Sequence, residues 1–251
     1  MIPVVNSALT RFANALNTGR IDARPGISYE INGRHFGDAD VNDWELRASR
    51  RALANIKHLL YEQKMLNLTS AQCDARDRYF KDILEESNGG WRECRTDMHI
   101  SDVKLEEVMA GRKWLMAKTR EERALTALLP AHPEHYAVPF YEGEESIVET
   151  VGDHMARLRL NTVEEVPTFV HAFGDNEFDA RKPTACKLQD GTPIFYVLHE
   201  SRNTAAGCHL RLRFIFPEKV PQAMIDQHAE HLAIEFRFGI RTTLQYLGGT
   251  A

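Results

Sequence analysis

The sequence has only four cysteines in 251 residues, and none of them lies in a CxxC pair or in another metal-finger spacing. Scattered thiols are typical of a reducing compartment and exclude a small domain held together by disulfides. No stretch approaches the roughly 18 apolar residues of a membrane-spanning helix. The first residues also lack the basic segment that precedes the apolar core of a secretory signal. We therefore expect a protein that stays in the cytoplasm, or is assembled there into a larger particle, without contact with a membrane.

The familiar catalytic signatures are missing as well. The chain contains no P-loop, no GxGxxG turn, no HExxH helix, no GxSxG elbow and no set of protein-kinase motifs. An excess of positive charge is missing too, since the net charge is −5 and the isoelectric point is about 6.1. This balance argues against a protein that coats nucleic acid, although a local basic face is compatible with it.

What the sequence does contain is a strong helical pattern near its C-terminal end, over residues 221–247. Pro221 suits the first turn of a helix, and Gly248 with Gly249 supplies its end. Apolar residues recur at helical spacing and form one stripe that is wide enough to pack on a sheet. The stripe consists of Ile225, Ala229, Leu232, Phe236, Ile240, Thr243 and Leu247. Arg237 and Arg241 lie on the opposite side, where we expect solvent or a partner.

Two segments of the second half alternate between apolar and polar residues with the period of a half-buried strand. They are residues 154–160 and 209–216. We expect the arginines of both strands to face outward. If these strands are neighbours, four arginines share one face of the sheet, namely Arg157, Arg159, Arg211 and Arg213. Such a face suits phosphate or a carboxylate-rich protein partner. The alternative is a solvated face that nearby aspartates and glutamates neutralise.

The remaining patterns predict the order of the elements. Residues 1–130 are mostly helical, with a small β-hairpin near 27–36 at the Asn32-Gly33 turn. The expected helices cover residues 6–16, 43–66, 69–86, 101–118 and 119–129, and capping boxes of Thr69 with Gln72 and of Thr119 with Glu122 open two of them. The expected strands cover 147–151, 154–160, 166–173, 185–188, 193–200 and 209–216. Residues 131–145 are rich in proline and predict a linker. The fold class is therefore α+β: a helical N-terminal half, then an antiparallel sheet over residues 146–251 with the long C-terminal helix packed on it.

A group of titratable residues lies along one edge of the apolar stripe, formed by His228, His231 and Glu235. Two imidazoles and a carboxylate in one arc can bind a divalent metal or transfer a proton. We add His199, at the end of a predicted strand, as a further metal ligand, with Zn²⁺ as the ion. The spacing His-x-x-His-x-x-x-Glu matches no known zinc helix, because those place their histidines four residues apart. The alternative is a polar edge that contacts the sheet or water.

Another pair of histidines, His132 and His135, lies within the proline-rich linker. The prolines around the pair favour an extended loop. We therefore expect both side chains on the surface rather than at a metal.

Two functions of different classes follow from these patterns. The first is an interaction or assembly protein, a structural subunit of an oligomer or of a multi-protein complex such as a viral particle. It needs protein partners and no cofactor, and nucleic acid is the less favoured partner. The second is a metal-dependent hydrolase or lyase that acts on small molecules through His231 and Glu235. We favour the first function because the arginine face is present and the catalytic signatures are missing.

Overall fold

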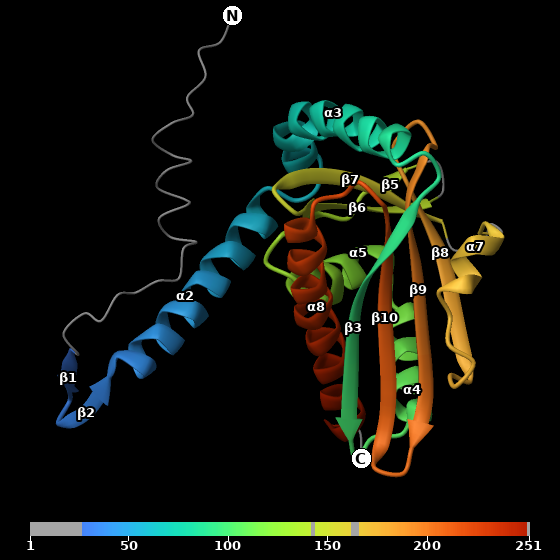
Figure 1. Ribbon diagram of the computed structural model, residues 1–251. Coiled ribbons are helices and arrows are strands. Elements are labelled where there is room, and N and C mark those ends of the chain that lie inside the picture. The colour runs from blue at the N-terminus through green and yellow to red at the C-terminus, as the bar shows by residue number, and fades with distance from the viewer. Residues whose placement is uncertain (1–26, 142–143, 162–165, 250–251) are drawn as a thin grey trace, which may run out of the picture. The chain divides into compact units, whose positions relative to one another are not determined.

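The computed structural model describes residues 27–141, 144–161 and 166–249 (Figure 1). The predicted helix over residues 6–16 lies outside these ranges. The chain divides into two compact units, residues 1–51 and residues 52–251. No helix among the described residues is long and apolar enough to cross a membrane.

The described part of the first unit contains the predicted hairpin. Its strands are β1 (Ser28–Ile31) and β2 (Arg34–Gly37), which pair antiparallel. Asn32 and Gly33 form the turn with φ angles of 53° and 74°, a region that these two residue types tolerate better than others. The hairpin leads into α2 (Asp38–Leu59), a helix that begins in the first unit and ends in the second.

The second unit is organised around an antiparallel sheet with the strand order β3-β10-β9-β8-β7-β6-β4, and β5 pairs with β6. The strands are β3 (Trp91–Ser101), β4 (His135–Ala137), β5 (Phe140–Tyr141), β6 (Glu144–Val151), β7 (His154–Asn161), β8 (Ala180–Lys187), β9 (Pro193–Thr204) and β10 (Gly207–Pro217). The edge strand β3 was not predicted from the sequence. Residues 131–145, the predicted linker, carry β4 and β5 and therefore contribute to the sheet.

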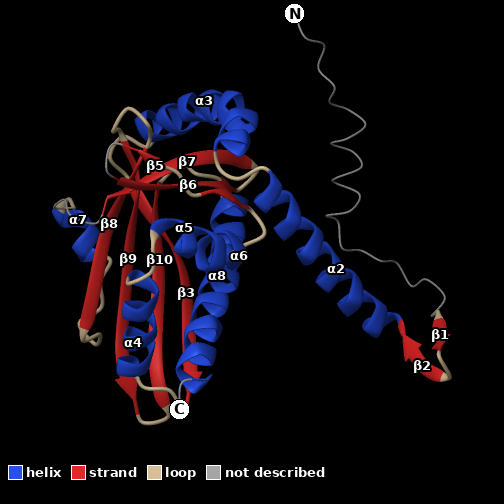
Figure 2. Ribbon diagram, turned by 180° about the vertical axis from the view of Figure 1, so that it is seen from behind, coloured by secondary structure: helices blue, strands red, loops and turns tan. Residues whose placement is uncertain are grey.

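Helices cover both faces of this sheet. They are α3 (Gln63–Glu86), α4 (Leu105–Met116), α5 (Arg120–Arg123), the π-helix η1 (Ala124–Leu128), α6 (Leu129–Ala131), α7 (Thr168–Ala172) and α8 (Gln222–Gly249). Helices α4, α5 and α8 lie on one face, which is in front in Figure 2. Helix α7 packs on the opposite face, where Val170 contacts the cluster of Tyr196, Leu198 and Ile215. The predicted α+β fold, with the long C-terminal helix packed on an antiparallel sheet, is confirmed.

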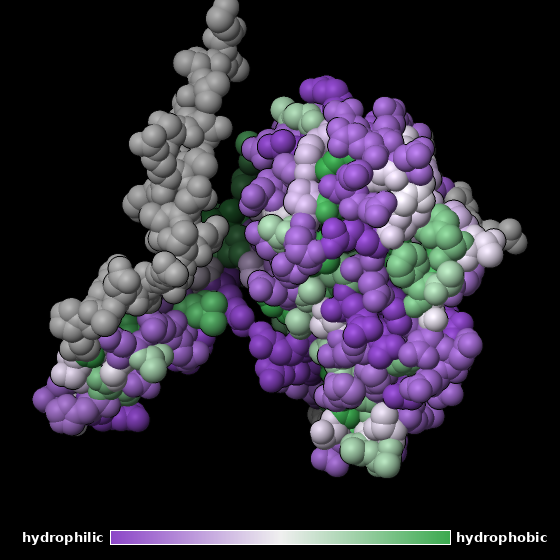
Figure 3. All heavy atoms as spheres, viewed as in Figure 1, coloured by the Kyte–Doolittle hydropathy of each residue, from purple (hydrophilic) through white to green (hydrophobic). Residues whose placement is uncertain are grey.

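The alternation that predicted β10 also determines where the core lies. Leu212, Phe214 and Phe216 point to the side of α8 and join the main hydrophobic cluster, which includes Leu232 and Ile240 of that helix. Burial of such side chains is the largest favourable contribution to folding. Seen from the side of Figure 1, hydrophilic residues predominate on the surface of this unit, and apolar residues gather over α7 (Figure 3).

Two predictions about local structure were wrong. Residues 166–173 were expected to form a strand, but they contain α7, since a short apolar run does not by itself distinguish a strand from a buried helix. Thr69 was expected to cap a helix, but α3 begins at Gln63. The Thr69 hydroxyl lies inside that helix and donates to the Met65 carbonyl, at 2.9 Å. The predicted capping box of Thr119 and Glu122 is present.

Asp77 on α3 provides a test of how pH acts on this fold. Its Oδ1 atom is buried and has no hydrogen-bond partner among the described residues. Burial, with a contribution from the charge of Asp74, raises the pKa of Asp77 from 3.8 to about 6. Because the folded state binds this proton more tightly than the unfolded chain does, Asp77 lowers stability as pH rises from 3.8 to about 6.

We expect Asp77→Asn to raise the free energy of unfolding by about 1 kcal/mol at neutral pH, a value reduced for the partial exposure of the side chain. The gain should vanish below the ordinary carboxyl pKa, where Asp77 is protonated in both states. Urea denaturation of wild type and variant at acid and neutral pH measures the difference. Asp82→Asn, an exposed change on the same helix, is the control. An equal gain at both pH values would contradict this account.

Candidate metal centre

Three buried side chains from three elements converge between the sheet and α8. His135 opens β4, Glu149 lies directly opposite it on β6, and His231 comes from α8. The Nε2 atoms of the two histidines are 3.0 Å apart. Glu149 Oε2 is 3.4 Å from Nε2 of His135 and 3.7 Å from Nε2 of His231. The three side chains are 8% exposed or less, so these polar atoms face one another without bulk water.

Two further groups adjoin this triad. Glu235 lies one helical turn after His231, and its Oε2 atom is 3.9 Å from Nε2 of His231. With 29% of its side chain exposed, Glu235 is on the solvent side of the group. The ring of His132, at the end of α6, stacks on the ring of His231 with centroids 3.8 Å apart. A ring nitrogen of His132 also lies within 4.8 Å of the nitrogens of His135 and His231.

A hydrogen bond to the backbone orients the imidazole of His135. Its Nδ1 atom is 2.7 Å from the carbonyl oxygen of Leu128, so Nδ1 carries the proton and donates it there. Nε2 is thereby left to face Glu149 and His231. Leu128 is the last residue of the π-helix η1, a distortion that is frequent at functional sites. Metal-binding histidines almost always make such a second hydrogen bond, which sets tautomer and ring orientation.

Lys57, at the C-terminal end of α2, holds the segment that carries His132 and His135. It is 6% exposed, and its Nζ atom donates to the carbonyls of Leu129 and His132, each at 2.9 Å. Burial lowers the pKa of Lys57 to about 8. The amine therefore ties the turn between η1 and β4, which carries His132 and His135, to α2.

The electrostatics of the triad follow from burial and mutual charge. Burial opposes charge on His135, but the hydrogen bond with Glu149 and the charges of Glu235 and Glu149 outweigh it and raise the pKa of His135. Burial also opposes charge on Glu149, but the hydrogen bond with His135 and the positive charge of that imidazole lower its pKa to about 2. Burial lowers the pKa of His231 to about 2 and that of His132 to about 4, so both are neutral at neutral pH.

The triad has the geometry of a metal-binding face. Ligand bonds of about 2.0–2.2 Å in a tetrahedral Zn²⁺ site place neighbouring donor atoms roughly 3.4 Å apart. The three measured separations are 3.0, 3.4 and 3.7 Å. Imidazole nitrogens and a carboxylate oxygen are also the donors that zinc and iron(II) take in sites with open positions. The residues present therefore fit a divalent transition metal.

His132 is less well placed as a ligand than Glu149. Its Nδ1 atom accepts the backbone N–H of Glu134 at 3.1 Å, so that nitrogen is occupied. Its ring also lies face to face with His231 at an interplanar angle of 20°, which makes the in-plane lone pairs run parallel instead of converging on one ion. His132 is therefore a neighbour of the triad that carries its proton on Nε2.

The predicted metal ligands have different positions in the structure. His231 belongs to the triad and Glu235 adjoins it. His228 is 3% exposed, stacks on His231 at 5.1 Å and packs against Phe214, but neither of its ring nitrogens has a hydrogen-bond partner among the described residues. His199 contacts Phe236, further along α8, with ring centroids 4.9 Å apart.

Sequence reasoning missed His135 and Glu149. The prediction that His132 and His135 lie on the surface was wrong, since they are 4% and 0% exposed. The prolines around them were expected to favour an extended loop, but this segment forms a turn that leads His135 into β4. The His-x-x-His spacing was the available signal, but the partner of His135 is Glu149, which is opposite it only after β4 and β6 have paired.

The predicted arginine face has a different arrangement. Strands β7 and β10 are separated by β8 and β9, so their arginines do not form one continuous group. Arg211 was expected to face outward, but it is engaged by Asp97 and Asp175, at 2.7 and 2.8 Å. Arg213, with the same expectation, is 4% exposed and bonds Glu200 at 3.0 Å. These carboxylates come from β3, β9 and the segment after α7.

The other predicted partner-binding arginines differ in exposure. Arg159 on β7 pairs with Glu144 at 2.9 Å, and Arg157 on the same strand is half-buried. Arg237 and Arg241 are exposed on α8, on the side predicted to meet solvent or a partner.

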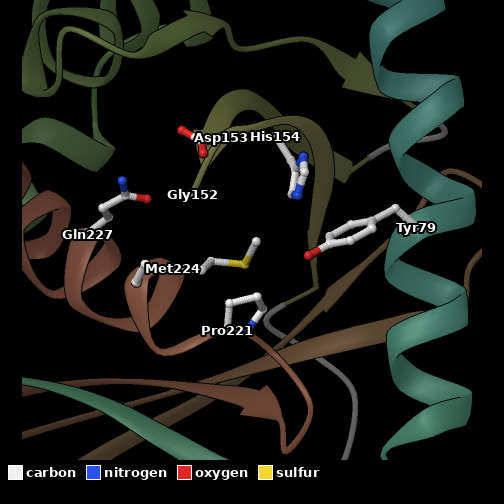
Figure 4. A pocket seen from close by; sticks show the side chains of 8 residues that line it. Tyr79, Gly152, Asp153, His154, Pro221, Met224 and Gln227 are labelled. Atoms are coloured by element: carbon white, nitrogen blue, oxygen red, sulfur yellow. The ribbon is translucent and has the colours of Figure 1, made fainter. Parts of the chain in front are cut away.

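A small pocket of about 90 Å³ lies elsewhere, between the β6–β7 turn, the start of α8 and α3 (Figure 4). Tyr79 and His154 form one side, with ring centroids 4.0 Å apart. Met224 and Gln227 of α8 line it as well. None of the triad residues lines this pocket.

Comparison with known proteins gives little further information. No protein-family description matches this sequence, and no curated protein is significantly similar to it. Among solved structures, the chain is similar to one titled "Crystal structure of Ara h 8.0201", with 9% identity and a TM-score of 0.39. The match covers 62% of this chain and 99% of that one. A likeness of this size carries no conclusion about family or function.

Proposed function

We propose that the protein is a metal-dependent hydrolase or lyase whose divalent cation, Zn²⁺, is held by His135, Glu149 and His231. The observation that carries the proposal is the buried triangle of two Nε2 atoms and one carboxylate oxygen, with edges of 3.0, 3.4 and 3.7 Å. The Leu128 carbonyl supports it, because it fixes the tautomer of His135 that leaves Nε2 directed at the triangle.

The composition of the donor set favours a catalytic over a structural metal. Structural zinc sites use four protein ligands and are rich in cysteine, whereas catalytic ones combine three protein ligands with a water molecule. Two histidines and one glutamate leave such a position open. Zinc supplies a Lewis acid that brings the pKa of its bound water near 7.

Two neighbouring residues have properties that suit proton handling. Burial raises the pKa of Glu235, and the Glu149 charge adds to that effect, so Glu235 is a better proton acceptor than an ordinary carboxylate. His132 is neutral and carries its proton on Nε2, which suits donation to the oxygen of a carbonyl substrate. The reaction class we infer is attack of water on a polarised carbonyl, with Glu235 taking the proton from the water.

The direct test is the metal content and metal dependence of untagged protein. We expect native mass spectrometry to find one zinc ion per chain after reconstitution and dialysis. Hydrolysis of 4-nitrophenyl acetate should cease when dipicolinate removes the metal and return when Zn²⁺ is added. A chain that retains no zinc, or hydrolysis that is the same with and without zinc, would contradict the proposal.

The assembly function predicted from the sequence stays a prediction. The predicted arginine face is the feature that bears most directly on an assembly function. A protein partner that bound Arg211 or Arg213 would have to replace the carboxylates of Asp97, Asp175 and Glu200. Arg237 and Arg241 are exposed on α8 and bond no carboxylate of the described residues, so they are the better candidates for a contact between subunits.

A further inference from the structure

Helix α2 buries almost none of its residues. Lys57 is the one buried residue in a helix that runs from Asp38 to Leu59. Its bulky apolar side chains are accessible instead, since Leu46 and Ile56 are 50% and 49% exposed. An amphipathic helix in a protein is stabilised chiefly by the packing of its apolar face. This helix therefore needs a partner that the described residues do not supply.

The exposed apolar residues of α2 belong to one stripe that has the spacing of a coiled-coil seam. Its positions follow one another in alternating steps of three and four residues, which keeps them within about 100° of the helix surface. They are Ala39, Asn42, Leu46, Ser49, Leu53 and Ile56. The β1–β2 hairpin packs on the opposite side of the helix, where the rings of Phe36 and Trp44 are 4.9 Å apart. The shape that fits the stripe is a second helix.

The charges of α2 are divided between its two halves, and this division indicates which helix fits. The acidic residues all lie in the first half and are Asp38, Asp40, Asp43 and Glu45. The basic residues follow them and are Arg47, Arg50, Arg51 and Lys57. A second copy of α2 in the antiparallel orientation brings the acidic half of each helix beside the basic half of the other. The helix is in this sense complementary to itself.

We propose that the stripe is the interface of a homodimer in which the α2 helices of two copies pack antiparallel. In the register that overlaps the helices over nearly their whole length, each bulky apolar side chain faces a shorter one, which lets the helices approach closely. The facing pairs are Leu46 with Ser49, Leu53 with Asn42, and Ile56 with Ala39 of the other copy. The dimer uses no residue of the proposed metal centre and does not require zinc.

The same register places Asp43 of each copy beside Arg50 of the other, so two-fold symmetry forms this ion pair twice. Both side chains are exposed, and Arg50 bonds no carboxylate of the described residues. Asp43 pairs with Arg47 of its own helix at 3.0 Å, on the side away from the stripe. A parallel pair would instead place Asp43 beside Asp38 of the other copy. The charges therefore favour the antiparallel orientation.

Sedimentation equilibrium and native mass spectrometry on the full chain measure the association. We expect a dimer with a dissociation constant on the order of micromolar, with and without zinc. Leu46→Glu should weaken it at least about a hundredfold, because it places a charge in the seam at two symmetric positions. Leu68→Glu, the same change at a leucine of α3 that is 63% exposed, is the control and should leave the dimer unchanged.

Charge variants test the orientation. Asp43→Arg and Arg50→Asp should each weaken the homodimer at least about tenfold, because each sets like charges side by side at two positions. An equimolar mixture of these two variants should form a heterodimer with the wild-type affinity, since every facing pair then again has opposite charges. This recovery separates a lost contact from a lost fold. Arg51→Asp, on the far side of the helix, is the control and should leave the dimer unchanged.

Three results would overturn the proposal. The first is a wild-type chain that stays monomeric at about 100 µM, which would assign the stripe to a different protein. The second is a dimer that Leu46→Glu leaves unchanged. The third is tighter association of Asp43→Arg, which a parallel pair predicts, or a mixture of the two charge variants that forms no heterodimer. A dimer that takes up no zinc would overturn the proposed function and leave this interface in place.

Discussion

Replacing His231 by alanine is expected to lower the affinity for Zn²⁺ at least about a hundredfold, since even groups outside the ligand set change metal affinity by 10–100-fold. His231 contributes one of the three donor atoms, and its loss leaves only His135 and Glu149, 3.4 Å apart. Competition with a fluorescent chelator measures the affinity. Zinc at about a thousandfold above its dissociation constant should also stabilise the wild type by about 4 kcal/mol, and this gain should disappear in the variant.

The matched control is His228→Ala. It removes the same side chain from the same helix, three positions earlier, and it is also buried, but His228 is not a ligand in this account. We expect this variant to lose some stability through the vacated space beside Phe214 and to keep the wild-type affinity for zinc. Equal losses of zinc affinity in the two variants would contradict the ligand assignment. Glu149→Gln, which keeps shape and polarity, should behave like His231→Ala.

The second large effect concerns stability alone. Glu200→Gln is expected to lower the free energy of unfolding by about 3 kcal/mol, because breaking a buried ion pair leaves an uncompensated charge. Glu200 is 1% exposed and is bonded by Arg213 at 3.0 Å, by Arg181 at 3.2 Å and by the Asp175 backbone N–H at 2.7 Å. Arg213 retains Glu93 as a partner, so we take the lower end of the range.

Calorimetry and urea denaturation measure this change, which should lower the melting temperature by roughly 6–12 °C in a chain of this size. Glu177→Gln is the control, because Glu177 pairs with Arg202 at 2.9 Å but is 69% exposed. Exposed pairs contribute at most about 1 kcal/mol. The same small loss in both variants would show that the Arg213–Glu200 pair is not buried as described.

The predictable parts of the fold were those determined by local pattern. The stripe from Ile225 to Ile240 specified α8, and the alternation of residues 209–216 specified β10, because each pattern extends over several turns or residues of one element. The Asn32-Gly33 turn was equally local. Thr69 and residues 166–173 were misassigned because their short signals suit two structures, and tertiary packing decided between them.

The site was only partly predictable for the same reason. His231 and Glu235 share an edge of one helix, so their proximity follows from helical spacing. His135 and Glu149 come from different strands and meet only because β4 pairs with β6. The prediction that Arg213 faces outward failed because Glu93 and Glu200, on the two neighbouring strands, bond its guanidinium group. Contacts of this kind depend on strand order, which periodicity within single elements does not determine.

The measurement that tests the metal centre most directly is X-ray diffraction from zinc-soaked crystals above and below the zinc absorption edge. Our account predicts one anomalous peak per chain, about 2.0–2.2 Å from Nε2 of His135, Nε2 of His231 and Oε2 of Glu149. A peak coordinated by other residues, or none where zinc saturates the crystal, would contradict it. In that case, the three side chains form a buried hydrogen-bonded cluster that stabilises the fold, and the function must be sought elsewhere on the molecule.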